Sequence, residues 1–364
     1  MKWVVCLLFL LAADSRSAQE SGGHRIGFRV EYLRDTLRYA DSSGSPRILQ
    51  TSIWYPSKYC EAPAMKYEDY FLLTGSEHGD SSPGSIDRTS LEKQYFKVLS
   101  SRGIAEKDAR LLFSLQLRAY PDALPRFERF PLILVAQGNF QSAHHQAILC
   151  EALASRGYVV MTCPSPTRIT GPMKNDEDAA RVMNDQLSDL EYMFDYARTL
   201  PYVDQTRVGI VCHSFGGRAG TVFANLHLET RAIVSLEGGI ALHSAVESIR
   251  KHPGFAPVRL KADILHFYET RDESAKADFS ILNSLTGIHT STLLLPHFRH
   301  SYFSTFGAAA GIIPGLISGS SSKVAQEWKQ LEDSTIVFLD GKLKGEKVRR
   351  DTVNRNGNDS EGPR

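Results

Sequence analysis

The sequence predicts an α/β fold in which a mostly parallel central sheet has helices on both faces and begins with antiparallel strands. From residue 130 onward, continuous apolar runs typical of strands buried on both faces alternate with segments of helical periodicity. Two segments rich in β-branched and aromatic residues stand ahead of them. With 42% hydrophobic and 23% charged residues in a chain of 364, the composition is typical of a globular protein with a large core.

The opening segments, GFRVEYLRDTL and RILQTSIWYP, end in turn formers and predict an antiparallel pair of strands. A polar loop at residues 76–88 follows, and residues 89–120 read as mainly helical. We therefore expect a single domain over residues 24–344, with a helical insertion at about 89–120.

The regular part of the fold follows this insertion. Helices are expected at residues 143–156, 176–200 and 215–228, and an amphipathic helix at 323–344 closes the domain. The expected buried strands lie in FPLILVAQG, YVVMTCPSP, RVGIVCHS, RAIVSLEGG, ADILHFYETRD and STLLLPH. Strands that alternate with helices imply a parallel sheet with both faces covered.

Both ends of the chain differ in composition from this domain. Residues 1–18 carry a lysine, an apolar stretch of about eleven residues and then small residues, which predicts a secretory signal peptide and a secreted or periplasmic protein. Cleavage is expected after Ala18, with Ala13 as the alternative. No later segment is long and apolar enough to span a membrane. The charged tail at 345–364 is expected to be disordered.

Charge and cysteine content limit the possible partners. The formal net charge is +1, so no overall field favours nucleic acid or an anionic membrane. The cysteines beyond the leader show no zinc-binding spacing and allow one disulfide rather than a framework; they are Cys60, Cys150, Cys163 and Cys212. We expect no cofactor and no metal.

The stretch RVGIVCHSFGGRAG places Ser214 between a buried strand and a helix. A nucleophile on such a turn needs small residues two positions before and after it. Gly216 meets the second requirement, with Gly217 beside it, and Cys212 takes the place of the usual first glycine. The turn lies at the carboxyl edge of a central strand, where open α/β sheets bind ligands. Ser214 is therefore a candidate nucleophile; the alternative is an ordinary residue at a strand-to-helix turn.

A serine nucleophile needs a histidine base and an orienting carboxylate, here expected downstream in the order serine, acid, histidine. The loop after the last strand offers His300 and His297, and we favour His300 because His297 directly follows Pro296 at the strand end. The other histidines, including His213 next to the serine, are expected to pack or to face solvent.

The acid remains open at this stage. Glu237 ends the strand after the nucleophile helix, and Asp272 follows the next strand. Either carboxylate could reach the imidazole, because both strands end at the same edge of the sheet. Each also has a structural explanation, as a local backbone acceptor for Glu237 and as a helix N-cap for Asp272. Glu269 is a more distant third candidate.

The oxyanion of a tetrahedral intermediate needs hydrogen-bond donors. The backbone amide of Phe215, directly after the serine, is the first candidate. The amide of Asn139 in LVAQGNFQSAHH is the second, because Gly138 lets the backbone turn toward the site. A simple strand-to-helix loop is the alternative reading of this segment.

These residues resemble the platelet-activating-factor acetylhydrolase and dienelactone hydrolase branch of the α/β-hydrolase family. The likeness runs from about Phe130 to Ile317 and rests on VCHSFGG, AQGN, SRGYVV and HSYFSTFGAAAGII. It implies an α/β-hydrolase fold. The acetylhydrolases carry their acid where this chain has Glu237, and the dienelactone hydrolases where it has Asp272. The latter use a cysteine nucleophile, and Ser214 departs from that pattern.

We therefore expect a secreted serine hydrolase that cleaves small-molecule carboxylic esters, lipid esters among them, through an acyl-enzyme on Ser214. The stretch FGAAAGIIPGLI could line an acyl pocket or contact a lipid surface, although we favour a buried helix of small residues. The rival hypothesis is a binding protein of the same fold without activity, suggested by Cys212 and by Gln137 where the family commonly has histidine. No sequence feature supports a peptidase.

Overall fold

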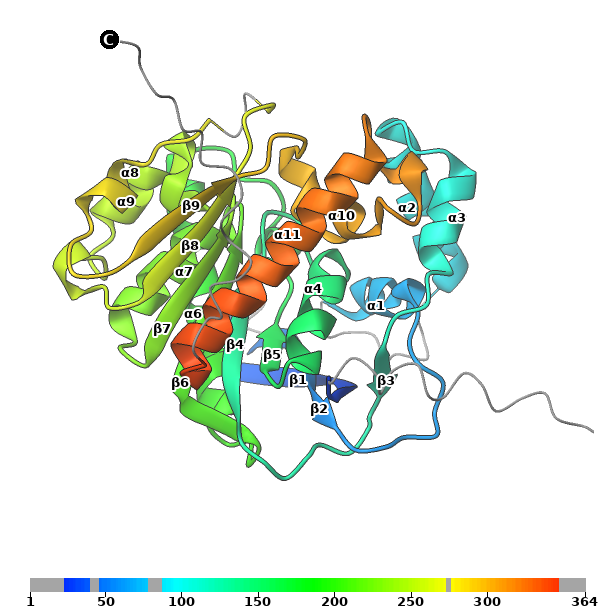
Figure 1. Cartoon of the computed structure of the whole chain (residues 1–364), viewed down its shortest axis with the longest axis horizontal. Coiled ribbons are helices and arrows are strands. Elements are labelled where there is room, and N and C mark those ends of the chain that lie inside the picture. Colours follow the sequence, from blue (N-terminus) through cyan, green and yellow to red (C-terminus); the bar gives the residue numbers. More distant parts are fainter. Residues whose placement is uncertain (1–22, 40–45, 78–86, 273–275, 347–364) are drawn as a thin grey trace, which may run out of the picture.

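A twisted sheet forms the centre of the computed structural model, which describes residues 23–39, 46–77, 87–272 and 276–346 (Figure 1). Within these ranges the sheet has nine strands in the order β3-β1-β2-β5-β4-β6-β7-β8-β9. The predicted signal peptide at 1–18 lies outside the described residues, as does the predicted tail from residue 347 onward.

Two pairings near one end of the sheet are antiparallel, and the other pairings are parallel. β1 (Arg25–Tyr39) pairs antiparallel with β2 (Pro46–Ser57), and β2 pairs antiparallel with β5 (Val159–Thr162). The parallel part contains β4 (Phe130–Ala136), β6 (Val203–His213), β7 (Thr230–Leu236), β8 (Asp263–Tyr268) and β9 (Thr290–Leu294). This arrangement confirms the predicted fold class.

The sheet extends by one strand that the sequence analysis did not anticipate. β3 (Ala119–Pro121) pairs parallel with β1 at the edge, in a segment expected to be helical. Three residues are too few to produce a recognisable alternation, so only the pairing identifies this strand.

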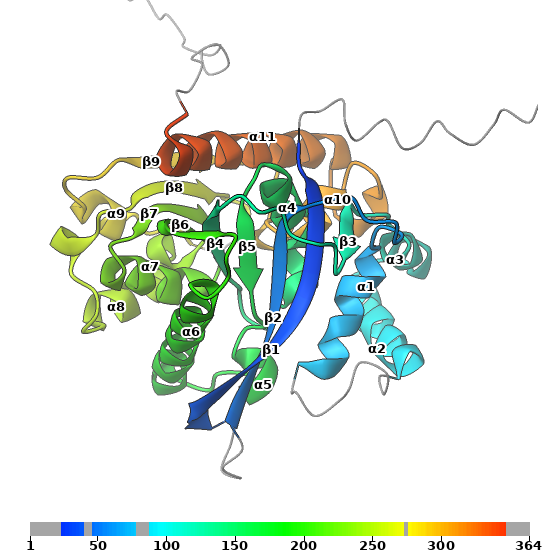
Figure 2. The same ribbon diagram turned by 90° about the horizontal axis from the view of Figure 1, so that it is seen from below.

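Helices cover both faces of the sheet (Figure 2). One face carries α4 (Ala143–Ser155), α10 (Thr305–Ala309) and α11 (Ser321–Leu339), with α1 (Tyr67–Leu72), α2 (Arg88–Ser101) and α3 (Glu106–Phe113) beside them. The other face carries α6 (Asp176–Ala197), α7 (Gly216–Leu226), α8 (His243–Lys251) and α9 (Ser280–Ser284). The two apolar cores therefore lie on opposite sides of the sheet.

Most expected helices are present at nearly the predicted positions. α4, α6 and α7 correspond to the helices expected at 143–156, 176–200 and 215–228. The closing helix expected at 323–344 is α11, followed by a π-helical turn at Asp340–Lys344. Short helix α5 (Thr167–Thr170) and helix α8 were not anticipated.

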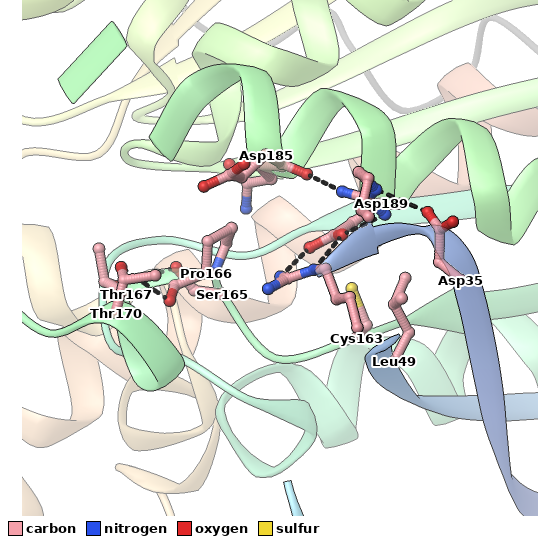
Figure 3. Close-up of polar contacts among 12 residues, drawn as sticks. Asp35, Leu49, Cys163, Ser165, Pro166, Thr167, Thr170, Asp185 and Asp189 are labelled. Atoms are coloured by element: carbon pink, nitrogen blue, oxygen red, sulfur yellow. Dashed lines mark hydrogen bonds and ion pairs between the residues drawn. The ribbon is translucent and has the colours of Figure 1, made fainter. Parts of the chain in front are cut away.

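A buried ionic network fastens α6 to the antiparallel strands (Figure 3). Arg47 on β2 donates through Nε and Nη2 to both carboxylate oxygens of Asp189, at 2.8 and 2.5 Å. Arg38 on β1 pairs with Asp189 at 2.9 Å and with Asp35 at 2.6 Å. Asp189 is fully buried, so its negative charge is compensated only by nearby guanidinium groups, and buried Arg47 in turn needs Asp189 as its partner.

Asp189→Ala is expected to lower the free energy of unfolding by about 3–5 kcal/mol, because it leaves Arg47 buried without its partner. Asp195→Ala on the same helix is the matched control: its ion pair with Arg198 is exposed, and its loss should cost less than about 1 kcal/mol. Urea denaturation of both variants provides the measurement. Equal losses in the two would contradict the structural role of the buried network.

Candidate active site

Ser214 occupies a tight turn between β6 and α7. Its backbone lies in the left-handed region, with φ 51°, a conformation that non-glycine residues seldom adopt. A Cβ atom on Gly216 would lie 2.2 Å from the carbonyl oxygen of Ala136, and one on Gly217 would lie 2.1 Å from the amide nitrogen of Gly239. Both glycines therefore allow a backbone approach that no other residue would permit.

Cys212, which stands where such a turn usually has a glycine, is accommodated by a glycine on α7. Cys212 is fully buried at the end of β6, and a Cβ atom on Gly220 of α7 would lie 2.2 Å from its sulfur. The extra bulk two residues before the serine is thus matched by a glycine about one turn into the helix. Cys212 packs there as a small apolar side chain.

A continuous hydrogen-bonded chain links Ser214 to an imidazole and a carboxylate. Nε2 of His300 lies 2.7 Å from Oγ of Ser214, and Nδ1 of the same ring lies 2.5 Å from Oε2 of Glu237. The Glu237 carboxylate is buried, whereas Ser214 is partly accessible and the His300 side chain is about one quarter exposed. The hydroxyl and the imidazole can therefore meet a ligand, while the acid stays out of solvent.

Of the candidate acids, Glu237 is the one that contacts the His300 ring. The backbone amide of Glu269 donates to its other carboxylate oxygen at 3.2 Å. The Glu269 carboxylate in turn accepts from the amide of Asp272 at 3.0 Å, within the turn after β8. Glu269 and Asp272 thus shape the neighbouring loop, and the Nδ1 position of His300 is taken by Glu237.

Burial and hydrogen bonding act in opposite directions on the Glu237 carboxyl. Burial raises its pKa above the ordinary value, and the hydrogen bond with His300 limits that rise. The ionised form of this carboxylate therefore depends on the imidazole that it orients.

A strained turn holds Glu237 in place. Its φ is 46°, and the next amide, that of Gly238, donates to Oγ of Ser235 at 3.1 Å. The same hydroxyl lies 2.9 Å from Nδ1 of buried His266. Burial lowers the pKa of His266 to about 3, so this ring stays neutral at physiological pH. The carbonyl of Ser214 accepts from the amide of Gly239 at 2.8 Å, which ties the acid turn to the serine turn.

The rival histidine belongs to a different pair. Nδ1 of His297 lies 2.5 Å from a carboxylate oxygen of Glu327 on α11, which also accepts the His297 backbone amide. His297 thus connects the loop after β9 to the closing helix, and His300 alone of the two contacts Ser214.

The loop after β4 lies directly against the serine turn. A Cβ atom on Gly138 would lie 3.1 Å from Cβ of Ser214 and 2.9 Å from Nδ1 of His213. In the described part of the chain, the amides of Asn139 and Phe215 donate to no protein acceptor. Neither amide is therefore committed to a hydrogen bond within the described residues.

Sequence reasoning missed the residue that holds this loop. Oε1 of Gln141 accepts from the amide of Gly138 at 2.9 Å and from Nδ1 of His213 at 2.7 Å. The His213 ring is buried and stacks on His300 with the ring centroids 5.2 Å apart. His213 thus packs, as expected, and also supports the catalytic candidate. In the sequence, the position of Gln141 three residues after Gly138 was the signal that could have identified it.

Over the described residues, no group of three or more His, Cys, Asp or Glu side chains could hold a metal ion. The same ranges contain no helix with the length and hydropathy needed to cross a bilayer. Cys60, Cys150, Cys163 and Cys212 are free thiols.

The strand order, the serine turn at the carboxyl edge of β6 and the downstream acid and histidine define the α/β-hydrolase fold. A solved ferulic acid esterase from Streptomyces cinnamoneus shares this fold, with a TM-score of 0.65 and 19% identity over 91% of this chain and 93% of that one.

The family follows from the sequence comparison. A model of the dienelactone hydrolase family matches residues 118–302, about half of the chain, and the protein belongs to that family. A Synechocystis sp. protein provisionally named carboxymethylenebutenolidase is 30% identical over 115 residues, which are 29% of this chain and 47% of that protein. The match thus spans about half the length of this curated relative.

Proposed function

We propose that the protein is a serine hydrolase that cleaves carboxylic esters through an acyl-enzyme on Ser214. The observation that carries this proposal is the hydrogen-bonded chain from the Ser214 hydroxyl through His300 to buried Glu237. Membership in the dienelactone hydrolase family supports the same reaction class. The serine nucleophile and the export of the protein are both part of the proposal. Export is supported only by the composition of residues 1–18.

The geometry is suited to general-base catalysis. Nε2 of His300 takes the proton of Ser214 as Oγ attacks the ester carbonyl, and Glu237 stabilises the imidazolium that forms. The amides of Phe215 and Asn139 stabilise the oxyanion. His300 then protonates the leaving alkoxide, and water activated by the same imidazole releases the acyl group from Ser214.

The acetylhydrolases and the dienelactone hydrolases that this chain resembles carry their acid at different positions. A carboxylate after the strand that follows the nucleophile helix is the acetylhydrolase pattern, and Glu237 is so placed on the turn after β7. The serine nucleophile agrees with that pattern. We therefore assign the acid role to Glu237, with Asp272 in the neighbouring loop.

The rival function is a binding protein of this fold without activity. Two sequence features suggested it, Cys212 and Gln137. Gly220 makes room for Cys212, and the loop after Gln137 leaves the Asn139 amide without a protein acceptor, so neither feature argues strongly against activity. Covalent labelling separates the two hypotheses.

A fluorophosphonate probe is expected to label the purified protein, because the reagent reacts with a serine that has an adjacent base. Labelling should be lost in Ser214→Ala and retained in Ser304→Ala, a buried serine in the loop before α10. Gel fluorescence gives the result. A folded protein that takes up no probe would favour the binding protein.

Glu237→Gln is expected to lower kcat for p-nitrophenyl acetate by about 10³- to 10⁴-fold, because the amide cannot stabilise the imidazolium of His300. Asp272→Asn should leave the rate unchanged. Steady-state kinetics on both variants, with circular dichroism as the folding control, test the assignment. The reverse order of effects would transfer the acid role to Asp272.

A further inference from the structure

Two loops at the sheet edge opposite the serine turn carry exposed apolar side chains. One connects β2 to α1 and the other connects β3 to β4, and both run along the lower side of the molecule in Figure 1. Tyr59 on the first loop is 67% exposed, and Leu124 and Phe127 on the second are 68% and 86% exposed. They are three of the six most exposed large hydrophobic residues in the described part of the chain. Such a group, unlike single exposed side chains, marks an interaction surface.

Backbone hydrogen bonds fix the two loops against each other. The amide of Lys58 donates to the carbonyl of Leu124 at 2.8 Å. The amide of Arg126 donates to the carbonyl of Pro56 at 3.0 Å. The exposed side chains therefore stand on an ordered base, and a partner that binds them does not have to order the backbone beneath them.

Cationic side chains lie directly beside the apolar ones. Nζ of Lys58 is 3.6 Å from the centroid of the Phe127 ring. Cζ of Arg25 is 4.9 Å from the centroid of the Tyr59 ring. Within the described residues, neither Lys58 nor Arg25 forms an ion pair with a carboxylate. Both charges can therefore meet an anionic group on a partner.

Positive charge prevails around this edge of the sheet. Half-buried His24 lies one residue before β1 and reports the local field. Burial lowers the pKa of His24, and the positive charges of Arg126 and Lys344 lower it further. Glu128, which pairs with Arg126 at 2.8 Å, acts in the opposite direction and offsets them only in part.

The two loops lie far from the candidate active site. The second loop leads into β4, which runs parallel to β6, and Ser214 follows β6 at its other end. The seven residues of β4 span about 23 Å. A surface that covered the loops would leave the serine turn open to the aqueous phase.

This combination of side chains suits the surface of a bilayer. Aromatic and aliphatic side chains flanked by lysine and arginine occupy the boundary between lipid headgroups and acyl chains. The cationic ends stay with the phosphates while the rings beside them are buried. A stable protein interface, in contrast, covers about 800 Å² with about 20–30 residues on each partner. The apolar side chains here come from two short loops only.

We propose that Tyr59, Leu124 and Phe127, flanked by Lys58 and Arg25, form a docking surface for an anionic phospholipid bilayer. Leu124 and Phe127 enter the boundary between headgroups and acyl chains, and Lys58 and Arg25 pair with lipid phosphates. Binding at these loops is peripheral and is independent of the proposed ester hydrolysis.

Cosedimentation with vesicles of equimolar POPC and POPG tests the docking surface. The protein used is residues 19–364, so that the apolar leader does not itself bind lipid. Leu124→Ser is expected to weaken binding by about tenfold, because an aliphatic side chain no longer leaves water. Ile312→Ser is the matched control: Ile312 is 67% exposed in the segment after α10, and its loss should have no effect.

Lysine variants test the electrostatic part. Residues 58–66 and 122–129 carry four cationic and three acidic side chains, and Arg25 adds a further positive charge. The gain from anionic lipid is therefore modest. Lys58→Gln should weaken binding by about fivefold at low salt, whereas Lys97→Gln on the exposed face of α2 should not. Vesicles of POPC alone should bind the unmodified protein more weakly than the mixture.

Equal binding of the Leu124→Ser and Ile312→Ser variants, or binding that does not rise with POPG, would overturn the proposal. Self-association in analytical ultracentrifugation without lipid, lost in Leu124→Ser, would also overturn it, because the loops would then serve a second copy of the chain. Circular dichroism checks that each variant is folded. If no ester is cleaved by any of these proteins, the hydrolase proposal fails and vesicle binding still decides the docking surface.

Discussion

The close approach of α7 to the neighbouring strand ends is the constraint on which the rest of the site depends. Ser214 can present its hydroxyl at φ 51° only because Gly216 and Gly217 let the helix start within van der Waals distance of Ala136 and Gly239. The contact with Gly239 carries the constraint to the acid turn, since the amide of Gly239 bonds the carbonyl of Ser214. Strain at the nucleophile and at Glu237 is therefore stored in one packed unit.

Neighbouring side chains support this unit at the acid turn and at the loop after β4. Ser235 and neutral His266 hold the acid turn, and Gln141 holds the loop that lies against Ser214. His213 donates through Nδ1 to Gln141 and stacks on His300, so it links this loop to the candidate base. Such fixed surroundings keep the reacting groups within hydrogen-bond reach, which is what catalysis by preorganised donors requires.

The regular elements could be predicted because their apolar runs and helical periods are long. The candidate serine and histidine could be predicted because Ser214 has glycine neighbours and His300 follows the last strand. The choice between Glu237 and Asp272 could not be predicted. It depends on the turn at Glu237, whose φ is 46°, and on which of the two carboxylates that backbone geometry brings to His300.

The most direct test of the central claim is to identify the covalent intermediate. Acid quenching of the enzyme during turnover of an ester, followed by proteolysis and mass spectrometry, should locate the acyl group on Ser214. A single adduct is expected there, with the mass of the substrate acyl group. An adduct on another side chain, or turnover that continues in Ser214→Ala, would contradict it.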